Sequence, residues 1–354
     1  MRLQQPTQGS FSARDEQTSH SIRLPGRLHP CAGHLALGVQ LTHTSAVQLT
    51  VAQITERLVA SYTQVGAINQ LDGKNLPSKH AIELITRDLL RLLFPGFFAE
   101  KLVHSSEINT ETGMLVAAVL GNLEVEIGKS LEYYPPPELP KKDLRPVARS
   151  YALEFLSSLP RLRELLQTDI EAAYNGDPAA LSKEEVIVAY PFIEAIAVQR
   201  LAHELYLKNI ALIPRIMTEW AHSRTGMDLH PGAIIGTHFF VDHCTGTVVG
   251  ETCDIGNHVK MYQGVGLVAA SLSPSKVQGL RGKKRHPTIE DHVTIYAGAT
   301  IMGGDTVVGE HSTIGANVFL TNSVPAYSLV IQEEANVKVM SKKDRQKQAA
   351  DFAV

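Results

Sequence analysis

The sequence has 354 residues, of which 44% are hydrophobic and 19% are charged, and its formal net charge is −3 at pH 7. This balance is typical of a globular protein and provides no general attraction to nucleic acid or to an anionic membrane. No apolar run approaches the ~20 residues that a membrane-spanning helix requires. We therefore expect neither a membrane nor a nucleic-acid partner.

The cysteine content indicates the redox environment. Cys31, Cys244 and Cys253 form no CxxC pair and no disulfide framework. This usage fits a reducing compartment, and we expect a cytoplasmic location.

The first 46 residues are rich in Gln, Ser, Thr and His and show no clear periodicity. We expect residues 1–46 to form a disordered tail. A transit peptide is the alternative, although Asp15 and Glu16 count against it because such peptides are poor in acidic residues.

Residues 47–226 are predicted to form a helical domain. Apolar residues recur at helical spacing, as in Val51, Ile54 and Leu58. Further helices are predicted over residues 82–92, 112–131, 147–169, 184–190, 191–207 and 214–223.

An aliphatic residue then returns every six positions, which is neither helical spacing nor simple strand alternation. The series runs through Leu229, Ile235, Val241, then Val249, Ile255, Met261, and again through Ile289, Ile295, Ile301 and Val307. A period of six indicates a parallel β-helix, in which three short strands form a coil of eighteen residues. We expect this coil over residues 227–330 and a charged tail over residues 331–354.

Two interruptions of the repeat mark where a functional site is expected. Residues 242–246, Asp-His-Cys-Thr-Gly, shift the repeat by two positions, and residues 267–287 form a predicted inserted loop rich in Gly, Ser and Lys. A solenoid tolerates such loops because the neighbouring coils keep it closed, and the loops usually lie on the binding face.

His243 is the candidate for acid–base chemistry. Asp228 precedes it by fifteen residues, so that adjacent turns of the coil can bring a carboxylate to one imidazole nitrogen and leave the other free to accept a proton. Arg285 and His286 end the inserted loop, and Arg285 can hold a carboxylate by a two-point bond. A nucleophilic thiol at Cys244 is the alternative.

Four motifs carry a resemblance to a known family. They are Gly176-Asp177-Pro178-Ala179-Ala180, Met227-Asp228-Leu229-His230-Pro231-Gly232-Ala233, Val241-Asp242-His243-Cys244-Thr245-Gly246 and Arg285-His286-Pro287-Thr288-Ile289. In combination they resemble serine O-acetyltransferase, the enzyme that transfers acetyl from acetyl-CoA to the hydroxyl of L-serine for cysteine synthesis. The resemblance implies an α+β fold, with a helical N-terminal region followed by a left-handed parallel β-helix of hexapeptide repeats that assembles as a homotrimer or a dimer of trimers.

The resemblance also implies roles for individual residues. His243 corresponds to the general base and Asp228 to its orienting partner. The serine-binding residues are Asp177, Asp242, Arg285 and His286, and the acetyl-CoA groove is expected near Ala269 and Ala297. Acetyl-CoA is the co-substrate, L-cysteine is an expected feedback inhibitor, and the chemistry requires neither a metal nor a covalent enzyme intermediate.

The sequence departs from the family at three places. The Gly-x-Pro-Ala-Lys that commonly follows the last coil is absent, as in a longer subgroup of the family. Residues 264–269 read Gly-Val-Gly-Leu-Val-Ala, where many members have Gly-Val-Thr-Leu-Gly-Gly or Gly-Val-Thr-Leu-Gly-Ala beside the acetyl-CoA site. The sequence ends in Val354, whereas members that dock into cysteine synthase typically end in Ile, which counts against that partnership.

Other functions remain open from the sequence. A β-helix enzyme that resembles carbonic anhydrase would bind zinc through three histidines, and the candidates are His230, His238, His243, His258, His286, His292 and His311. That function would leave the predicted serine-binding aspartates without a role. A non-catalytic β-helix paralogue and a sugar as the acetyl acceptor are further alternatives.

Overall fold

The computed structural model describes residues 49–99, 101–136, 143–270 and 282–333. The predicted N-terminal tail and the C-terminal tail from residue 334 onward lie outside the described residues. The chain divides into two units, of which the first ends at Gln70 and the second begins at Leu71. Each unit is described by itself.

The first unit contains α1 (Val51–Gln64), which is followed by a short 3-10 helix at Gly66–Ile68. Thr50 begins α1 with a capping box, because its side chain accepts from the backbone of Gln53 while the Gln53 side chain accepts from the backbone of Thr50. The apolar face that predicted this helix is exposed, and no residue of α1 is buried.

The second unit begins with seven helices among the described residues. They are α2 (Lys79–Leu93), α3 (Ile108–Tyr133), α4 (Arg145–Ser157), α5 (Leu159–Gly176), α6 (Lys183–Ala189), α7 (Pro191–Leu207) and α8 (Ile213–Thr225). None of the described helices is alone long and apolar enough to cross a membrane, and only α6 and α7, bent by 75° at their junction, reach that length and composition together.

The predicted single helix over residues 147–169 is wrong, because α4 ends before Ser158 and α5 begins after it. Pro160 lies in the first turn of α5, where its missing N–H costs nothing. In the middle of a continuous helix the proline ring would clash with the carbonyl of Leu156. The chain therefore ends one helix and begins another.

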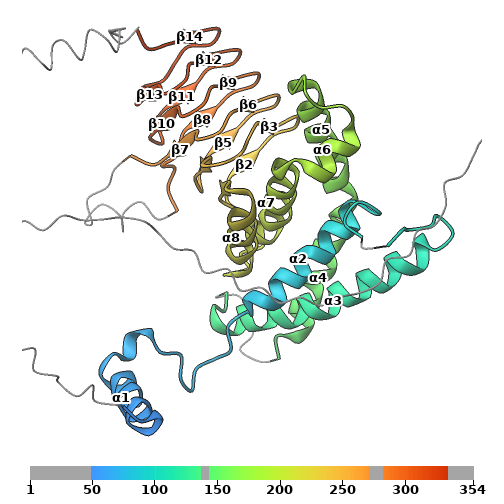
Figure 1. Cartoon of the computed structure of the whole chain (residues 1–354), viewed down its shortest axis with the longest axis vertical. Coiled ribbons are helices and arrows are strands. Elements are labelled where there is room, and N and C mark those ends of the chain that lie inside the picture. The colour runs from blue at the N-terminus through green and yellow to red at the C-terminus, as the bar shows by residue number, and fades with distance from the viewer. Residues whose placement is uncertain (1–48, 100, 137–142, 271–281, 334–354) are drawn as a thin grey trace, which may run out of the picture. The chain divides into compact units, whose positions relative to one another are not determined.

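Among the described residues, fourteen short strands follow α8 and coil into three parallel sheets (Figure 1). The strands are β1 (Asp228–Leu229), β2 (Ile234–Ile235), β3 (Phe240–Val241), β4 (Val248–Val249), β5 (Asp254–Ile255), β6 (Lys260–Met261), β7 (Gly266–Val268), β8 (Thr288–Ile289), β9 (Thr294–Ile295), β10 (Thr300–Met302), β11 (Val307–Val308), β12 (Thr313–Ile314), β13 (Phe319–Leu320) and β14 (Leu329–Val330). Each strand pairs with the strand three places on, except that β12 pairs with β14, and the sheet orders are β1-β4-β7-β10-β13, β11-β8-β5-β2 and β14-β12-β9-β6-β3. The predicted parallel β-helix is confirmed.

The strand register locates both interruptions. Asp228 pairs with Val248, twenty residues on, whereas Val248 pairs with Gly266, eighteen residues on. Asp254 pairs with Thr288 across the inserted segment. Since β7 continues to Val268, the strand takes up the first two residues of the predicted loop, and the insertion begins after them.

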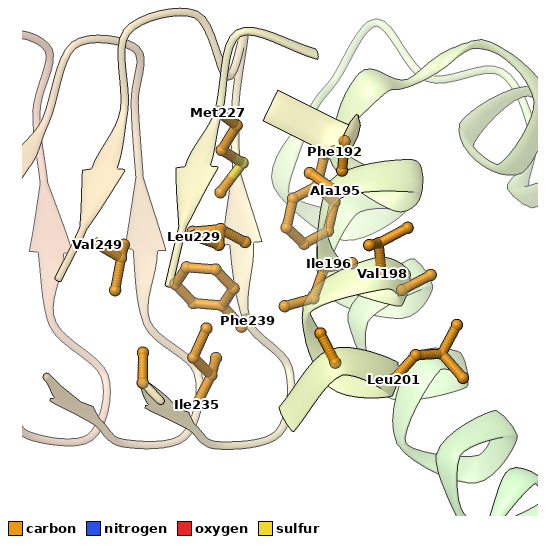
Figure 2. Close-up of a cluster of buried hydrophobic side chains, with 14 of the residues drawn as sticks. Phe192, Ala195, Ile196, Val198, Leu201, Met227, Leu229, Ile235, Phe239 and Val249 are labelled. Atoms are coloured by element: carbon orange, nitrogen blue, oxygen red, sulfur yellow. The ribbon is translucent and has the colours of Figure 1, made fainter. Parts of the chain in front are cut away.

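The helical part and the coil share one core. Phe192, Ile196 and other apolar residues of α7 face Leu229 and Phe239 of the first coil (Figure 2). These side chains are buried to 2% exposure or less, and their removal from water stabilises the junction by about 25 cal/mol per Å² of apolar surface. The first coil is therefore fixed against α7.

A buried ion pair fixes α5 to the same coil. Arg200 of α7 donates to both carboxylate oxygens of Asp169 on α5, at 2.8 and 2.9 Å. Arg200 also donates to the carbonyl oxygens of Ile235 and Gly236, and Asp169 accepts from the backbone of Phe239. Because the pair is fully hydrogen-bonded, its burial is tolerated, and the C-terminal end of α5 is held over the coil.

Candidate active site

The first cluster of predicted site residues lies at the connection between β3 and β4, residues 242–247, which we call the His243 corner. His243 and Cys244 both have left-handed backbone conformations, with φ of 61° and 52°. The His243 side chain is 73% exposed, and its Nε2 lies 3.8 Å from Oδ1 of Asp242. The two extra residues of this corner therefore turn an imidazole outward beside a carboxylate.

Cys244 points in the opposite direction, into the coil. Its side chain is buried, and its Sγ lies 3.5 Å from the carbonyl oxygen of Val241. Burial, and secondarily the charge of Asp242, raises the pKa of the Cys244 thiol to about 12. A buried thiol with this pKa is not a nucleophile, so the thiol alternative loses its support.

Asp228 begins β1 at the same corner. Gly246 donates its N–H to the carbonyl of Gly226 at 2.8 Å, and Asp228 donates its own N–H to the carbonyl of Thr247 at 2.9 Å. The structure thus brings Asp228 to the corner that holds His243, as predicted from their spacing. Within the described part of the chain, however, the carboxylate paired with His243 is that of Asp242, and Asp228 makes no side-chain bond to the imidazole.

Asp177 reaches the His243 corner from the C-terminal end of α5. Its carboxylate accepts from the hydroxyl of Tyr190 at 2.5 Å and from the N–H of Ala179 at 2.8 Å. These two bonds, with smaller effects of His243 and Lys260, hold the pKa of Asp177 below its ordinary value. Asp177 is therefore an anion within electrostatic range of the His243 imidazole.

Tyr190 is a site residue that the sequence did not reveal. Its hydrogen bond to Asp177 comes first among the causes, followed by burial, that raise the pKa of Tyr190 to about 12. The hydroxyl consequently stays protonated and continues to donate to the carboxylate. Pro191, the first residue of α7, follows it directly, so the start of α7 positions this donor.

The second cluster lies where β4 ends and β8 begins, at residues 250–252 and 285–287, which we call the Arg285 corner. Thr252 donates its N–H to Nδ1 of His286 at 3.1 Å, and Oγ1 of Thr252 accepts from the N–H groups of Arg285 and His286 at 2.9 and 3.1 Å. Since Nδ1 accepts a hydrogen bond, the proton of the neutral ring lies on Nε2. Burial, followed by the charge of Arg285, lowers the pKa of His286 to about 4.

Gly250 makes room for this imidazole. A Cβ atom at residue 250 would lie 2.0 Å from Cδ2 of His286. No side chain tolerates that distance, so only glycine allows His286 to pack flat against the backbone at this position. The ring orientation is therefore built into the coil.

Arg285 is anchored by residues that the sequence analysis did not identify. Its Nη2 forms an ion pair with Oε2 of Glu251, and Oε1 of Glu251 accepts from the hydroxyl of Tyr206 on α7 at 2.7 Å. Nη1 of Arg285 is buried and has no hydrogen-bond partner among the described residues. Glu251 and Thr252 follow β4 after one intervening residue, Gly250, and their place just after a coil strand is the sequence signal that marks them.

The two clusters occupy different corners of the coil. The His243 corner precedes β4 and the Arg285 corner follows it. One side of the coil takes about six residues, and an extended residue advances about 3.3 Å, so the corners are on the order of 15–20 Å apart. A single serine molecule cannot reach both corners of one chain.

Comparison with known proteins identifies the family, although no family model matches the chain. The chain is 43% identical over 264 residues to a plasmid-encoded serine acetyltransferase of Synechococcus elongatus, which covers 73% of this chain and 82% of that protein. It is 44% identical over 128 residues to the serine acetyltransferase of Bacillus licheniformis, which covers 36% of this chain and 56% of that protein.

A solved structure agrees with the sequence comparison. The crystal structure of serine acetyltransferase isoform 3 from Entamoeba histolytica, in complex with cysteine, matches with a TM-score of 0.63 at 30% identity and covers 85% of this chain and 99% of that one. The chain belongs to the serine acetyltransferase family. The predicted family, the acyltransferase class and the predicted fold, a helical region followed by a left-handed parallel β-helix, are confirmed.

The predicted acetyl-CoA residues of this serine acetyltransferase family member also lie at two corners. Ala297 lies at the connection between β9 and β10, on the same edge of the coil as the His243 corner, whereas Ala269 follows β7 on the edge of the Arg285 corner. Gly246, Gly264 and Gly298 follow one another along the His243 edge with positive φ. This edge therefore presents a strip of backbone without side chains, which fits a long flat co-substrate.

Most of the candidate zinc-binding histidines form a stack at the third edge. The rings of His238, His258, His292 and His311 follow one another at centroid distances of 4.1, 4.6 and 4.5 Å, with interplanar angles of 20° or less. Their ring nitrogens lie in parallel planes and do not converge on one point. Across residues 49–333, excluding the undescribed gaps, no group of three His, Cys, Asp or Glu side chains is arranged to hold a metal ion.

Proposed function

We propose that this member of the serine acetyltransferase family transfers the acetyl group of acetyl-CoA to the hydroxyl of L-serine, giving O-acetyl-L-serine for cysteine synthesis. The proposal rests on one observation: the two corners carry complementary sets of charged and hydrogen-bonding groups. The His243 corner offers two carboxylates and an exposed imidazole, and the Arg285 corner offers a guanidinium and a neutral imidazole. A zwitterionic amino acid with a hydroxyl group needs this combination.

The His243 corner serves the ammonium and hydroxyl ends of serine. Asp177 and Asp242 bind the ammonium group, and His243 faces the hydroxyl. A serine hydroxyl is a weak nucleophile until a base removes its proton. His243 accepts that proton as the oxygen forms a bond to the acetyl carbon, the carbon–sulfur bond breaks, and the proton passes to the departing thiolate of coenzyme A.

Asp228 orients the general base in this proposal. It lies at the same corner as His243, and a carboxylate bonded to one imidazole nitrogen keeps the other nitrogen unprotonated. A general base of this kind contributes roughly 10²–10⁴-fold to the rate. The exposed His243 side chain must rotate before it can pair with Asp228 instead of Asp242.

The Arg285 corner binds the carboxylate of serine and stabilises the negative charge that develops during acetyl transfer. Arg285 binds the serine carboxylate, since its guanidinium is permanently charged and suited to two-point bonds. His286 is neutral over the working pH range because its pKa is lowered to about 4. Its Nε2–H can therefore donate a hydrogen bond without adding a charge.

The separation of the corners requires a second copy of the chain. In a homotrimer, or in a dimer of such trimers, the His243 corner of one copy can face the Arg285 corner of the next around a threefold axis. Serine then lies between two subunits, and the glycine strip near Ala297 faces the region of Ala269 in the neighbour. Acetyl-CoA occupies the groove so formed.

Regulation and location complete the proposal. L-cysteine presents the same ammonium and carboxylate as L-serine and is expected to compete at the same site, and a relative from Entamoeba histolytica has been solved in complex with cysteine. The described cysteines, Cys244 and Cys253, are free and buried, which supports the expected cytoplasmic location. Docking into cysteine synthase, and the division into a helical domain up to residue 226 and a coil from residue 227, stay proposals.

The test is thiol release from acetyl-CoA by the purified protein, measured with and without L-serine. We expect release that depends on L-serine, with O-acetyl-L-serine as the product. Release that is unchanged by serine, or that depends on a sugar alcohol instead, would overturn the proposal.

A further inference from the structure

We propose that Tyr206 and Glu251 are positioning residues that keep one face of the Arg285 guanidinium available for the substrate carboxylate. The proposal rests on the function proposed above and assigns a role to a side chain of α7, which belongs to the helical part of the chain. It arises from the hydrogen-bond sequence Tyr206–Glu251–Arg285 and from the unpartnered Nη1 of Arg285.

Tyr206 is itself held in one position. Its ring packs edge-on against the ring of His230, with centroids 5.9 Å apart at 85°. His230 is fixed in turn, because Gly232 donates its N–H to Nδ1 of His230 at 2.9 Å. Burial, followed by the hydrogen bond to Glu251, raises the pKa of Tyr206 to about 12, so the hydroxyl remains a donor at every usable pH.

Glu251 is shared between two donors. Oε1 accepts from Tyr206 and Oε2 pairs with Nη2 of Arg285. Burial alone would raise the pKa of Glu251, but these two hydrogen bonds hold it below its ordinary value. The Cγ methylene of Glu251 also packs against Gly232, where a Cβ would lie 2.9 Å from that atom, so the Glu251 side chain has little room to move.

The two carboxylate oxygens of Glu251 bond to different residues, and the proposal depends on this arrangement. A carboxylate with both oxygens free takes a guanidinium in a two-point, parallel arrangement. Because the hydrogen bond from Tyr206 turns Oε1 towards the tyrosine hydroxyl, Glu251 pairs with Arg285 through Oε2, and Nη1 is left buried without a partner among the described residues. An unpartnered buried donor is costly unless a ligand satisfies it, and the carboxylate of serine has the matching chemistry.

Removal of the Tyr206 hydroxyl therefore has a specific consequence. The Glu251 carboxylate is then free to turn so that Oε1 faces Nη1 of Arg285. Arg285 is held in a two-point pair with Glu251, and the serine carboxylate must compete with that pair. The Michaelis constant for serine should rise, whereas the turnover number and the Michaelis constant for acetyl-CoA should not, since neither depends on the free face of Arg285.

The experiment is a steady-state comparison of the full-length protein with Tyr206→Phe. We expect the Michaelis constant for L-serine to rise roughly tenfold or more, which corresponds to one hydrogen bond with a charged group. The turnover number and the constant for acetyl-CoA should change less than about twofold. His203→Ala is the control, because His203 bonds from α7 to the carbonyl of Pro231 at 2.8 Å without contacting Glu251.

A double-mutant cycle separates positioning from simple stabilisation. Glu251→Gln cannot form the charged two-point pair, so adding Tyr206→Phe to Glu251→Gln should change the serine constant little. Additive effects in the cycle, equal rises for both substrates, or the same rise in His203→Ala would each refute the positioning role. If the wild type shows serine-dependent thiol release and Tyr206→Phe has the same kinetic constants, only the role of Tyr206 and Glu251 is refuted. If the wild type shows no serine-dependent release, the proposed function itself is refuted.

Discussion

At the scale of single residues, the His243 side chain points away from the coil at a corner where two consecutive residues, His243 and Cys244, have left-handed backbone conformations. Left-handed φ is costly for a residue with a Cβ, and the neighbouring corners at Gly264 and Gly298 use glycine for it. The strain at His243 and Cys244 directs the imidazole outward and the thiol inward. The same conformation recurs at His238, His258, His292 and His311 along the third edge, so the His243 corner is distinguished by two such residues in succession.

The first prediction concerns His243 itself. His243→Ala should lower the turnover number at least about a hundredfold, because the serine hydroxyl loses its base. The fold should persist, since the side chain is exposed. Turnover measured beside a Cys244→Ala control, which we expect to stay active, checks the assignment, and a nearly normal rate in His243→Ala would rule it out.

The second prediction concerns the pH dependence of stability. Burial, followed by nearby cations, lowers the pKa of both His230 and His286 from the ordinary 6.5 to about 4. Between these values the unfolded chain binds protons that the folded chain does not, so stability should be complete above pH 6.5 and should fall as the pH drops towards 4. Each such proton contributes a slope of about 1.4 kcal/mol per pH unit.

Thermal or denaturant unfolding between pH 4.5 and 7.5 measures this slope. His286→Gln removes one of the two groups, and glutamine can still accept from Thr252, so the slope should be roughly halved. A wild-type stability that is constant over this range would contradict the buried neutral state of both rings.

At the scale of elements, the six-residue period alone predicted the coil, since a buried aliphatic residue at that interval is the sequence signature of a parallel β-helix. The break at Ser158 was missed because the prediction placed Pro160 inside one continuous helix. Proline is instead favoured in the first turn of a new helix, and Pro160 lies there in α5. Tyr190, Tyr206 and Glu251 could not be predicted either. Tyr206 meets Glu251 across 45 residues of sequence, and only the packing of α7 on the coil brings them together.

The third prediction uses the length of the His243 corner. Six residues, 242–247, connect β3 to β4, whereas four residues, 262–265, connect β6 to β7. Deletion of Cys244 and Thr245 would give Asp-His-Gly-Thr, with Gly246 in the place that Gly264 occupies in the shorter corner. The coil should persist and serine acetylation should be lost, because the left-handed pair that directs His243 is gone.

Circular dichroism and sedimentation test the fold of this deletion variant, and thiol release tests its activity. Deletion of Gln263 and Gly264 is the matched control: it leaves two residues for a corner that needs four, and we expect it to prevent folding. Retained activity after the Cys244–Thr245 deletion would show that the two-residue shift is dispensable for catalysis.

At the scale of the whole molecule, the proposed site residues lie in two groups on different edges of one coil. The charges of His243 and Lys260 act on the pKa of Asp177, whereas those of Arg285, Glu251 and Lys284 act on the pKa of His286. The resemblance predicted the serine-binding and catalytic residues without saying how they are divided between corners. Under the proposed function, the coil geometry adds that two copies of the chain must meet to form one serine site.

The last prediction follows from this division. His243→Ala inactivates one corner and Arg285→Ala weakens the other, so each variant alone should be nearly inactive at low serine concentration. In mixed trimers assembled at random from equal amounts, about one site in four combines an intact His243 corner with an intact Arg285 corner of the neighbouring copy.

Co-expression of the two variants with different affinity tags, followed by purification through both tags, provides the mixed trimers. Thiol release at low serine should recover to roughly a quarter of the wild-type rate in a random mixture, and somewhat more after selection for mixed species. If one chain contained a complete site, every chain in the mixture would carry a defect and no rate would return. Failure to recover activity in verified mixed trimers would therefore place Arg285 and His243 in the same subunit's site and refute the shared arrangement.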